Sequence, residues 1–448
     1  MSNSKPLISA FTPPPNGWIH ARKDGKIYDK KFIQDFRTVE RYKEYKACGF
    51  DEIIFAGEDK YVGEEYSTSQ LKKMLDIAYE ADLKAIVFDE RILSATVRAQ
   101  SQLVGELFDS EDQLDDFIRE CVKDYSLHPA FYGVSIIDEP FIAKKKVIHD
   151  IAKAFKRVLP SAFVHTCFNP LSCVEGGPMQ EVVLGPGKNG YDAYGKYIDA
   201  MSVPELGYFG YDDYPFKWWE GVPAVEKYVT TMQFVARRCL KNDIPFHMTV
   251  QSYASNTVDK KGKRYDLTQG HFDFLVNLAL GFGVEKLYYY TYWRFSTRSR
   301  LDSPDVAIMN EDGSKNWYDQ VQKSNTLFRK TREHLEGFKY VDSEYFSAPM
   351  GSPVVKDFVS HPLNVFSEVE SDFPLMLNKL EKDGKTLFML QNMASPYEKK
   401  YNQLHLKFIK PRTSVDAIVN GRKKSVIVDN NELLFILAPG EAVWFFDL

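Results

Sequence analysis

Gly133-Val-Ser-Ile-Ile-Asp-Glu-Pro140 carries the strongest fold signal in this chain. Its first five residues form a largely apolar run, which is typical of a parallel strand buried on both faces. The run ends in two carboxylates, Asp138 and Glu139, and Pro140 can open a helix because proline is tolerated at the first helical position. A strand that ends in acids before a helix is typical of an α/β barrel. The same residues also fit a simple helix start capped by Asp138.

The strand-then-helix pattern recurs along the first 340 residues. The apolar runs that predict strands are 6–11, 52–56, 84–88, 132–137, 163–168, 207–211, 246–251 and 286–292. The amphipathic segments that predict helices are 29–47, 69–82, 111–127, 141–158, 190–200, 224–241, 268–281 and 316–337. Eight such units in succession predict a protein of the α/β class, with a (β/α)8 or TIM barrel over residues 1–340.

Beyond residue 340 the helical periodicity ends and short β-rich runs follow one another. The predicted strands there are 364–370, 385–392, 403–410, 414–419, 424–428, 433–437 and 441–446. Asp383-Gly384 and Asn420-Gly421 are strong hairpin signals. We therefore expect an all-β sandwich domain over residues 341–448.

Composition argues against several classes of partner. The formal net charge is −5 and there is no basic block, so we expect no nucleic-acid partner. No segment approaches the ~20 apolar residues of a membrane span. The five cysteines are scattered without zinc spacing, which argues against a disulfide framework or a metal site. The first residues do not resemble a secretory signal, which favours a cytoplasmic protein unless a leader has been removed.

Polar and aromatic residues gather where the predicted barrel strands end. In strand order they are Glu58, Asp89, Asp138, Glu139, Asn169, Asp212, Asp213, Tyr214, Gln251, Tyr253, Tyr292 and Trp293. The carboxyl ends of barrel strands meet on one rim, so these side chains are expected to converge. Carboxylates and amides bind hydroxyl groups, and aromatic rings cover the C–H faces of sugars. The set predicts a carbohydrate site.

Each of these residues also has a purely structural interpretation. Glu58 and Asp89 could be helix caps or salt-bridge partners. The Asp212-Asp213 pair could belong to a turn, because aspartate favours turns. Their joint occurrence on one rim is what favours an active site.

Several longer stretches carry a resemblance to a known group of enzymes. They are FTPPP (11–15), HPAFYGVSIIDEPF (128–141), GYDDYPF (210–216), NLALGFGVEKLYYYTYW (277–293) and NEDGSKNWYDQVQKSN (310–325). In order and spacing they resemble clan A glycoside hydrolase barrels, most of all poorly characterised bacterial relatives of family 42 β-galactosidases. The ending LAPGEAVWFFDL (437–448) resembles the last strands of the β-sandwich often appended to such barrels. The resemblance implies a glycosidase that binds an oligosaccharide and needs no metal or organic cofactor.

The resemblance also implies catalytic roles. In that clan the general acid/base is a glutamate at the end of the fourth strand, which Glu139 matches. The clan nucleophile is a glutamate at the end of the seventh strand, where this sequence has Gln251, and a glutamine cannot form a stable glycosyl ester. Asp212 is our first choice for the second carboxylate, as base or nucleophile, with the alternatives Asp138, Asp89 and Glu58. A carboxyl separation of ~5–5.5 Å would imply retention, and ~6.5–9.5 Å inversion.

Two other functions remain open from the sequence. Loss of the seventh-strand acid is compatible with a catalytically inactive, sugar-binding barrel. A metal-dependent barrel enzyme such as an isomerase would need histidine and acidic ligands on the rim. His165 and His247 lie inside predicted strands, so we expect them to pack rather than to bind metal. The sequence leaves open the sugar, its linkage and the oligomeric state.

Overall fold

The computed structural model describes most of the chain and divides it into two compact units. The described residues are 7–23, 26–55, 68–171, 180–188, 190–216, 225–254, 266–294, 297–298, 306–347, 357–397 and 400–448. The first unit comprises 1–222, 244–264 and 286–318, and the second comprises 223–243, 265–285 and 319–448. The sequence-based boundary between residues 340 and 341 stays a prediction. No helix in the described ranges combines the length and the apolar character that a bilayer crossing requires.

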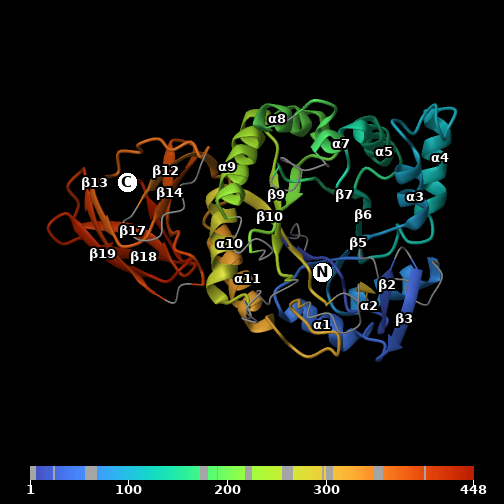
Figure 1. Cartoon of the computed structure of the whole chain (residues 1–448), viewed down its shortest axis with the longest axis horizontal. Helices are drawn as coiled ribbons and strands as arrows, with labels where there is room; N and C mark the ends of the chain where they lie inside the picture. Colours follow the sequence, from blue (N-terminus) through green and yellow to red (C-terminus); the bar gives the residue numbers. More distant parts are fainter. Residues whose placement is uncertain are drawn as a thin grey trace. The chain divides into compact units, whose positions relative to one another are not determined.

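The first unit is built on an eight-stranded parallel sheet (Figure 1). Its strands are β1 (Ile8–Ala10), β4 (Glu52–Ile54), β5 (Lys84–Val87), β6 (Phe131–Asp138), β7 (Phe163–Cys167), β8 (Phe209–Asp212), β9 (Phe246–Gln251) and β10 (Val284–Tyr290). The hydrogen-bonded order runs from β7 through β1 to β8, and a bridge between Phe168 and Tyr211 joins the outer strands. The sheet therefore closes, and the predicted (β/α)8 barrel with its eight strands is confirmed.

Helices follow the barrel strands in the predicted order. They are α1 (Val39–Ala47), α2 (Thr68–Glu80), α4 (Glu111–Val122), α5 (Lys145–Val158), α8 (Gly190–Met201), α9 (Val225–Asn242), α10 (Gln269–Gly281) and α11 (Tyr318–Arg332). Three short helices were not predicted: α3 (Glu90–Arg98), η1 (Ile142–Lys144) and α7 (Gln180–Leu184). Asp89 caps α3, so an aspartate after β5 is the local signal that marks the start of this helix.

The predicted helix over residues 29–47 is half wrong. Its first part belongs to strand β3 (Lys26–Phe32), which forms an antiparallel hairpin with β2 (Trp18–Lys23). The helix begins only after Thr38, whose side chain accepts a hydrogen bond from the Arg41 amide. Every side chain of β3 is exposed, so this segment has no apolar stripe to bury as a helix.

A buried ion pair fills the amino-terminal end of the barrel. Glu52, the first residue of β4, lies 2.8 Å from the Lys286 ammonium group of β10. The ammonium group also lies 4.6 Å from the centre of the Phe163 ring. Burial raises the pKa of Glu52 and lowers that of Lys286, and in each case the partner's charge opposes the effect. Each charge is therefore held in the interior by the other.

The second unit contains a β-sandwich, as predicted. Its strands are β12 (Lys339–Phe346), β13 (Phe366–Ser371), β14 (Leu375–Lys382), β15 (Lys385–Asn392), β16 (Asn402–Phe408), β17 (Ser414–Val419), β18 (Arg422–Ile427), β19 (Glu432–Leu437) and β20 (Ala442–Phe446). A six-stranded sheet in the order β12-β14-β15-β20-β17-β18 faces the three-stranded sheet β13-β16-β19. An apolar core that includes Leu377, Leu390, Leu404 and Phe445 lies between them. The sequence analysis missed β12 and β14.

Both predicted hairpins of this unit are confirmed. Asp383-Gly384 joins β14 to β15, and Asn420-Gly421 joins β17 to β18. All four turn residues have positive φ angles, between 49° and 78°. This conformation suits glycine and asparagine or aspartate, and it matches the twist of the flanking strands.

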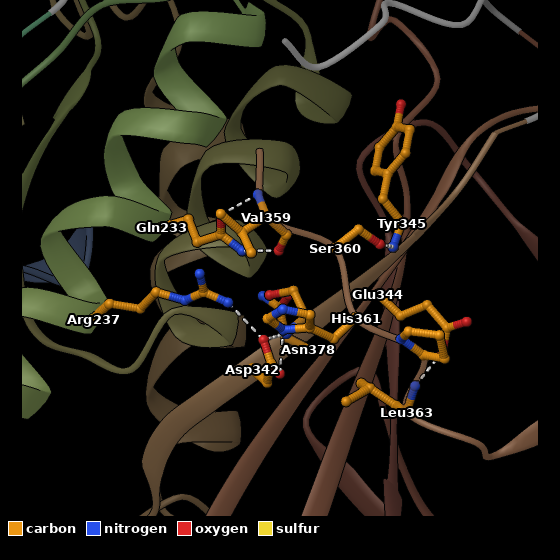
Figure 2. Close-up of polar contacts among 12 residues, drawn as sticks. Gln233, Arg237, Asp342, Glu344, Tyr345, Val359, Ser360, His361, Leu363 and Asn378 are labelled. Atoms are coloured by element: carbon orange, nitrogen blue, oxygen red, sulfur yellow. Dashed lines mark hydrogen bonds and ion pairs between the residues drawn. The ribbon is translucent and has the colours of Figure 1, made fainter. Parts of the chain in front are cut away.

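Polar side chains attach helix α9 to strand β12 and to the segment that follows it (Figure 2). The Arg237 guanidinium lies 2.7 Å from one carboxylate oxygen of Asp342, and the other oxygen is 2.8 Å from Nδ1 of His361. The Gln233 amide donates to the Val359 carbonyl oxygen at 2.8 Å and accepts from the Val359 amide at 2.9 Å. These contacts fix residues 359–361 against the outer strand of the six-stranded sheet.

Candidate functional site

The acidic turn after β6 lies on the carboxyl-end rim of the barrel. The side chains of Asp138 and Glu139 are exposed, whereas Pro140 is buried behind them. Glu139 has a φ angle of 43°, a left-handed conformation that is uncommon for residues other than glycine. Its amide donates to the Cys167 carbonyl oxygen of β7 at 2.8 Å. This bond fixes the backbone of Glu139 against the neighbouring strand.

Three buried side chains hold the turn from behind. The Tyr197 hydroxyl of α8 donates to the Pro140 carbonyl oxygen at 2.7 Å, and the Asn169 amide donates to the same oxygen at 3.3 Å. The Tyr194 hydroxyl donates to the Asn169 carbonyl oxygen at 2.9 Å. Asn169 therefore supports the acidic turn. Sequence reasoning missed the two tyrosines, because their spacing on one helix predicts only core packing.

Asp212 ends β8 and is 8% exposed. Burial raises the pKa of its carboxyl group to about 7, and the negative charge of Asp138 raises it further, against a hydrogen bond with Tyr214 that lowers it. A carboxyl group with this pKa exchanges protons readily near neutral pH. No lysine or arginine among the described residues forms an ion pair with it.

Three carboxyl groups converge on the buried thiol of Cys167. Its sulfur lies 3.7 Å from Oδ1 of Asp212 and 3.6 Å from the Thr249 hydroxyl. Burial raises the pKa of this thiol well above its usual range, and the charges of Asp212, Asp138 and Glu139 raise it further. The three acids thus share one region of the rim, on the adjacent strands β6, β7 and β8. No sequence pattern distinguishes Cys167 from the other cysteines.

Gln251 occupies the end of β9 but its amide is engaged by the backbone. Its oxygen accepts from the Phe216 amide at 2.8 Å, and its nitrogen donates to the carbonyl oxygens of Phe216 at 3.2 Å and Tyr253 at 2.9 Å. A glutamate could make only the first of these bonds, because a carboxylate accepts but does not donate. Gln251 fastens two rim loops together, a role the sequence did not suggest.

Asp89 is also fully engaged within the protein. It is 0% exposed, caps α3 through the Arg91 amide, and pairs with the Arg91 guanidinium at 2.7 Å. The Tyr125 hydroxyl donates to the same carboxylate at 3.0 Å. The structural interpretation of Asp89 as a cap and salt-bridge partner accounts for all these contacts.

Aromatic rings border the acidic region. The rings of Tyr214 and Tyr290 stack with centres 5.4 Å apart, and Tyr253 meets Tyr290 edge-on at 6.2 Å. All three are half-buried, so part of each ring is open to solvent. Such a wall suits the apolar face of a sugar ring.

The other two predicted aromatic ligands are not part of this wall. Tyr292 is 0% exposed and packs 4.7 Å from Tyr45, and Trp293 is 1% exposed and packs 4.7 Å from Phe36. Both rings are covered by protein, and the structure places them in the core. The alternation of side chains along the last strand is the physical reason for this difference from Tyr290.

The remaining predicted site residues fall into two groups. Asp213 is buried next to Asp212, and its Oδ1 accepts from the Tyr214 amide at 2.8 Å, which is turn chemistry. Glu58 lies outside the described residues. Within the described ranges no group of histidine, cysteine, aspartate and glutamate side chains is arranged to hold a metal ion.

Comparisons with known proteins support the fold. No family model matches the chain, and no curated protein is similar to it in sequence. Among solved structures, a family 5 glycoside hydrolase from Bacteroides vulgatus superposes with a TM-score of 0.51 and 8% identity, over 99% of this chain and 88% of that chain. Another glycoside hydrolase gives a TM-score of 0.50 and 10% identity, over 99% and 92%. At these identities the likeness concerns the fold alone.

Proposed function

We propose that the protein is a glycoside hydrolase that acts on an oligosaccharide. The observation that carries this proposal is the gathering of Asp138, Glu139 and Asp212 around Cys167, beside the half-exposed rings of Tyr214, Tyr253 and Tyr290. Two carboxyl groups suffice for glycoside hydrolysis without a cofactor. The glycoside hydrolase fold of the solved structures agrees with this activity, and the finer resemblance to family 42 β-galactosidases belongs to the proposal.

In the proposed reaction Glu139 is the general acid. It protonates the glycosidic oxygen as the bond from that oxygen to the anomeric carbon breaks. Its exposed side chain on a backbone fixed by Cys167 suits a group that must reach substrate and exchange its proton with solvent. Asp212 is the general base, which removes a proton from the water that attacks the anomeric carbon. A pKa of about 7 is matched to that role.

We favour inversion of the anomeric configuration. Asp212 has a shorter side chain than the glutamate nucleophile of the clan, and it withdraws below the rim, where it is 8% exposed. A withdrawn carboxylate leaves room for a water molecule next to the sugar. Tyr214, Tyr253 and Asp138 would bind the substrate in this arrangement, with Asp213 shaping the turn.

A screen of aryl glycosides, with the first product examined by proton NMR, tests the proposal. We expect release of the aryl group by the wild type and the inverted anomer as the first product. Glu139→Gln should lower turnover by about 10²–10⁴-fold, and by less on substrates with good leaving groups, because these need less protonation. Glu90→Gln, an exposed glutamate after β5, is the matched control. Unchanged turnover of Glu139→Gln on a natural glycan would exclude the assignment.

The second candidate is a sugar-binding barrel without turnover. The engagement of Gln251 with Phe216 and Tyr253 favours it, because the clan's nucleophile position has a structural use here. No hydrolysis of any glycoside, combined with measurable binding of an oligosaccharide by calorimetry, would select this function.

A further inference from the structure

We propose that the small sheet β11-β2-β3 is a distal binding platform for the negatively charged part of an extended glycan. This inference rests on the proposed function, because it names the substrate class of the same site. Strand β11 (Thr297–Arg298) pairs with β2 in parallel, and β3 forms the free edge beyond β2. Figure 1 shows β2 and β3 as a blue ribbon of two strands.

The position of this sheet in the chain places it on the functional face of the barrel. Strands β2 and β3 lie between the carboxyl end of β1 and helix α1, and β11 lies between the carboxyl end of β10 and helix α11. In a (β/α)8 barrel such loops form the same face as the catalytic residues. A glycan that extends from the site has this sheet within the loops around it.

The sheet exposes more apolar surface than an edge strand needs. On β3, Tyr28 is 55% exposed, Phe32 is 50% exposed and Ile27 is 47% exposed. The Phe32 ring lies 5.1 Å from the half-buried ring of Trp18 on β2. Exposed aromatic side chains that form a pair are typical of a binding surface, since burial in the core would otherwise be favoured.

Basic side chains accompany these rings. Lys23, Lys26, Lys30 and Lys31 are all exposed, and Asp29 is the single acidic residue of β3. Within the described residues none of the four ammonium groups has a carboxylate partner. Lys30 extends its ammonium group to 5.3 Å from the centre of the Trp18 ring. The chain as a whole carries a net charge of −5, so this cluster runs against the general charge.

Edge protection and self-association account for the sheet less well. Lysines on an edge strand prevent aggregation, but the exposed Tyr28 and Phe32 would work against that purpose. A second copy of the chain could pair with β3, yet antiparallel pairing would bring the lysines of two copies together, and like charges opposite each other are destabilising. An anionic sugar polymer satisfies both features, because its carboxylates or sulfates pair with the lysines and its ring faces cover the aromatic side chains.

Affinity electrophoresis in native gels tests the platform without requiring turnover. The gels contain polygalacturonate, a sulfated galactan or a neutral galactan, so that carboxylate, sulfate and uncharged polymers are compared. We expect the wild-type chain to be retarded by at least one anionic polymer more than by the neutral one. Raising the salt concentration should weaken this retardation, because exposed charges are screened.

Two variants locate the binding surface. Lys26→Gln/Lys30→Gln/Lys31→Gln should raise the dissociation constant for the anionic polymer by about tenfold, from three lost exposed charge contacts. Phe32→Ser should raise it by about threefold or more through lost stacking. The control Lys145→Gln/Lys153→Gln/Lys156→Gln removes three exposed lysines from α5 and should bind like the wild type. Circular dichroism confirms that each variant is folded.

The outcomes separate this proposal from the proposed function. Retardation that the triple variant of β3 loses supports the platform, even if no glycoside is hydrolysed and the hydrolase assignment fails. Hydrolysis of aryl glycosides without preferential retardation by either anionic polymer overturns the platform alone. Equal retardation of both triple variants also overturns it, as does a dimer of the wild type that Phe32→Ser disperses.

Discussion

Two buried carboxyl groups of the same barrel, Glu52 and Asp212, have opposite surroundings. Glu52 begins β4 at the amino-terminal end and lies 2.8 Å from the Lys286 ammonium group. Asp212 ends β8 at the carboxyl end, where its neighbours are the Cys167 thiol, the Tyr214 hydroxyl and a second carboxylate, Asp138. The first is charged and paired, whereas the second is placed against a like charge.

The difference separates a structural acid from a functional one. A buried charge is tolerated when an opposite charge compensates it, and removing the partner is strongly destabilising. A carboxyl group kept near another carboxylate costs stability, and such arrangements cluster at functional sites because they shift a pKa towards neutral pH. The contrast predicts that mutations at the two ends affect different properties.

The largest effect is expected for Asp212→Asn. Loss of the proposed base should lower turnover by about 10²–10⁴-fold. Stability should not fall. The folded-state pKa of about 7 lies above the ordinary value of 3.8, so ionisation of Asp212 destabilises the wild type as pH rises through this interval. The variant should therefore equal the wild type in urea unfolding at pH 4 and equal or exceed it at pH 8. Activity close to that of the wild type would show that Asp212 is not the functional acid of the two.

Glu52→Gln is the matched change at the other end of the barrel. It leaves the Lys286 charge buried without a partner, so the free energy of unfolding should fall by about 3–5 kcal/mol. Urea denaturation at pH 7 measures this loss. The double variant Glu52→Gln/Lys286→Met should recover most of it, because both charges are then removed. Equal stability of the single variant and the wild type would show that the pair is not needed.

Asp138→Asn tests the like charge beside Asp212. The Asp138 charge is the second cause, after burial, of the raised pKa of Asp212, so removing it should lower that pKa. The activity of a base rises as pH passes its pKa, and the acidic limb of the kcat/KM profile should move to lower pH. Asp116→Asn, on the exposed face of α4, should leave the limb in place. A limb that moves to higher pH in Asp138→Asn would contradict a repulsion between the two carboxylates.

Tyr197→Phe tests whether the support behind Glu139 matters. Loss of the hydrogen bond to the Pro140 carbonyl oxygen should lower kcat by about tenfold, which corresponds to one buried hydrogen bond, while KM stays nearly constant. Tyr194→Phe is the control, because its hydroxyl bonds to Asn169 and not to the acidic turn. An equal loss of stability in both variants with no change in kcat would reduce Tyr197 to a packing residue.

The smallest effect is expected at Asp342, a paired carboxylate of the second unit (Figure 2). Hydrogen bonds from the Ser343 amide, His361 and Arg237 lower its pKa, against the effect of burial. The stabilisation is therefore present above the ordinary pKa of 3.8 and is lost as pH falls through the lowered pKa. Asp342→Asn should reduce the free energy of unfolding at pH 7 by about 1 kcal/mol. The difference from the wild type should shrink on acidification, and a constant difference would contradict it.

The order of the elements could be predicted from the sequence alone. Eight apolar runs with amphipathic segments between them specify the barrel, because period and length are local properties. The hairpins at Asp383-Gly384 and Asn420-Gly421 were equally predictable, since positive φ angles favour these residues. The acidic turn of Asp138 and Glu139 after a strand was visible for the same reason. The hairpin of β2 and β3 was not, because its exposed side chains carry no periodic apolar signal.

Which rim residues remain available for chemistry depends on tertiary contacts. Asp89 is bound by Tyr125, 36 residues away, and Gln251 by Phe216, 35 residues away. Tyr292 and Trp293 are covered by Tyr45 and Phe36 from other elements. The pKa of Asp212 depends on burial and on a charge from another strand. Such partners meet only when the barrel closes, so local sequence signals the residue type at each strand end but not its use.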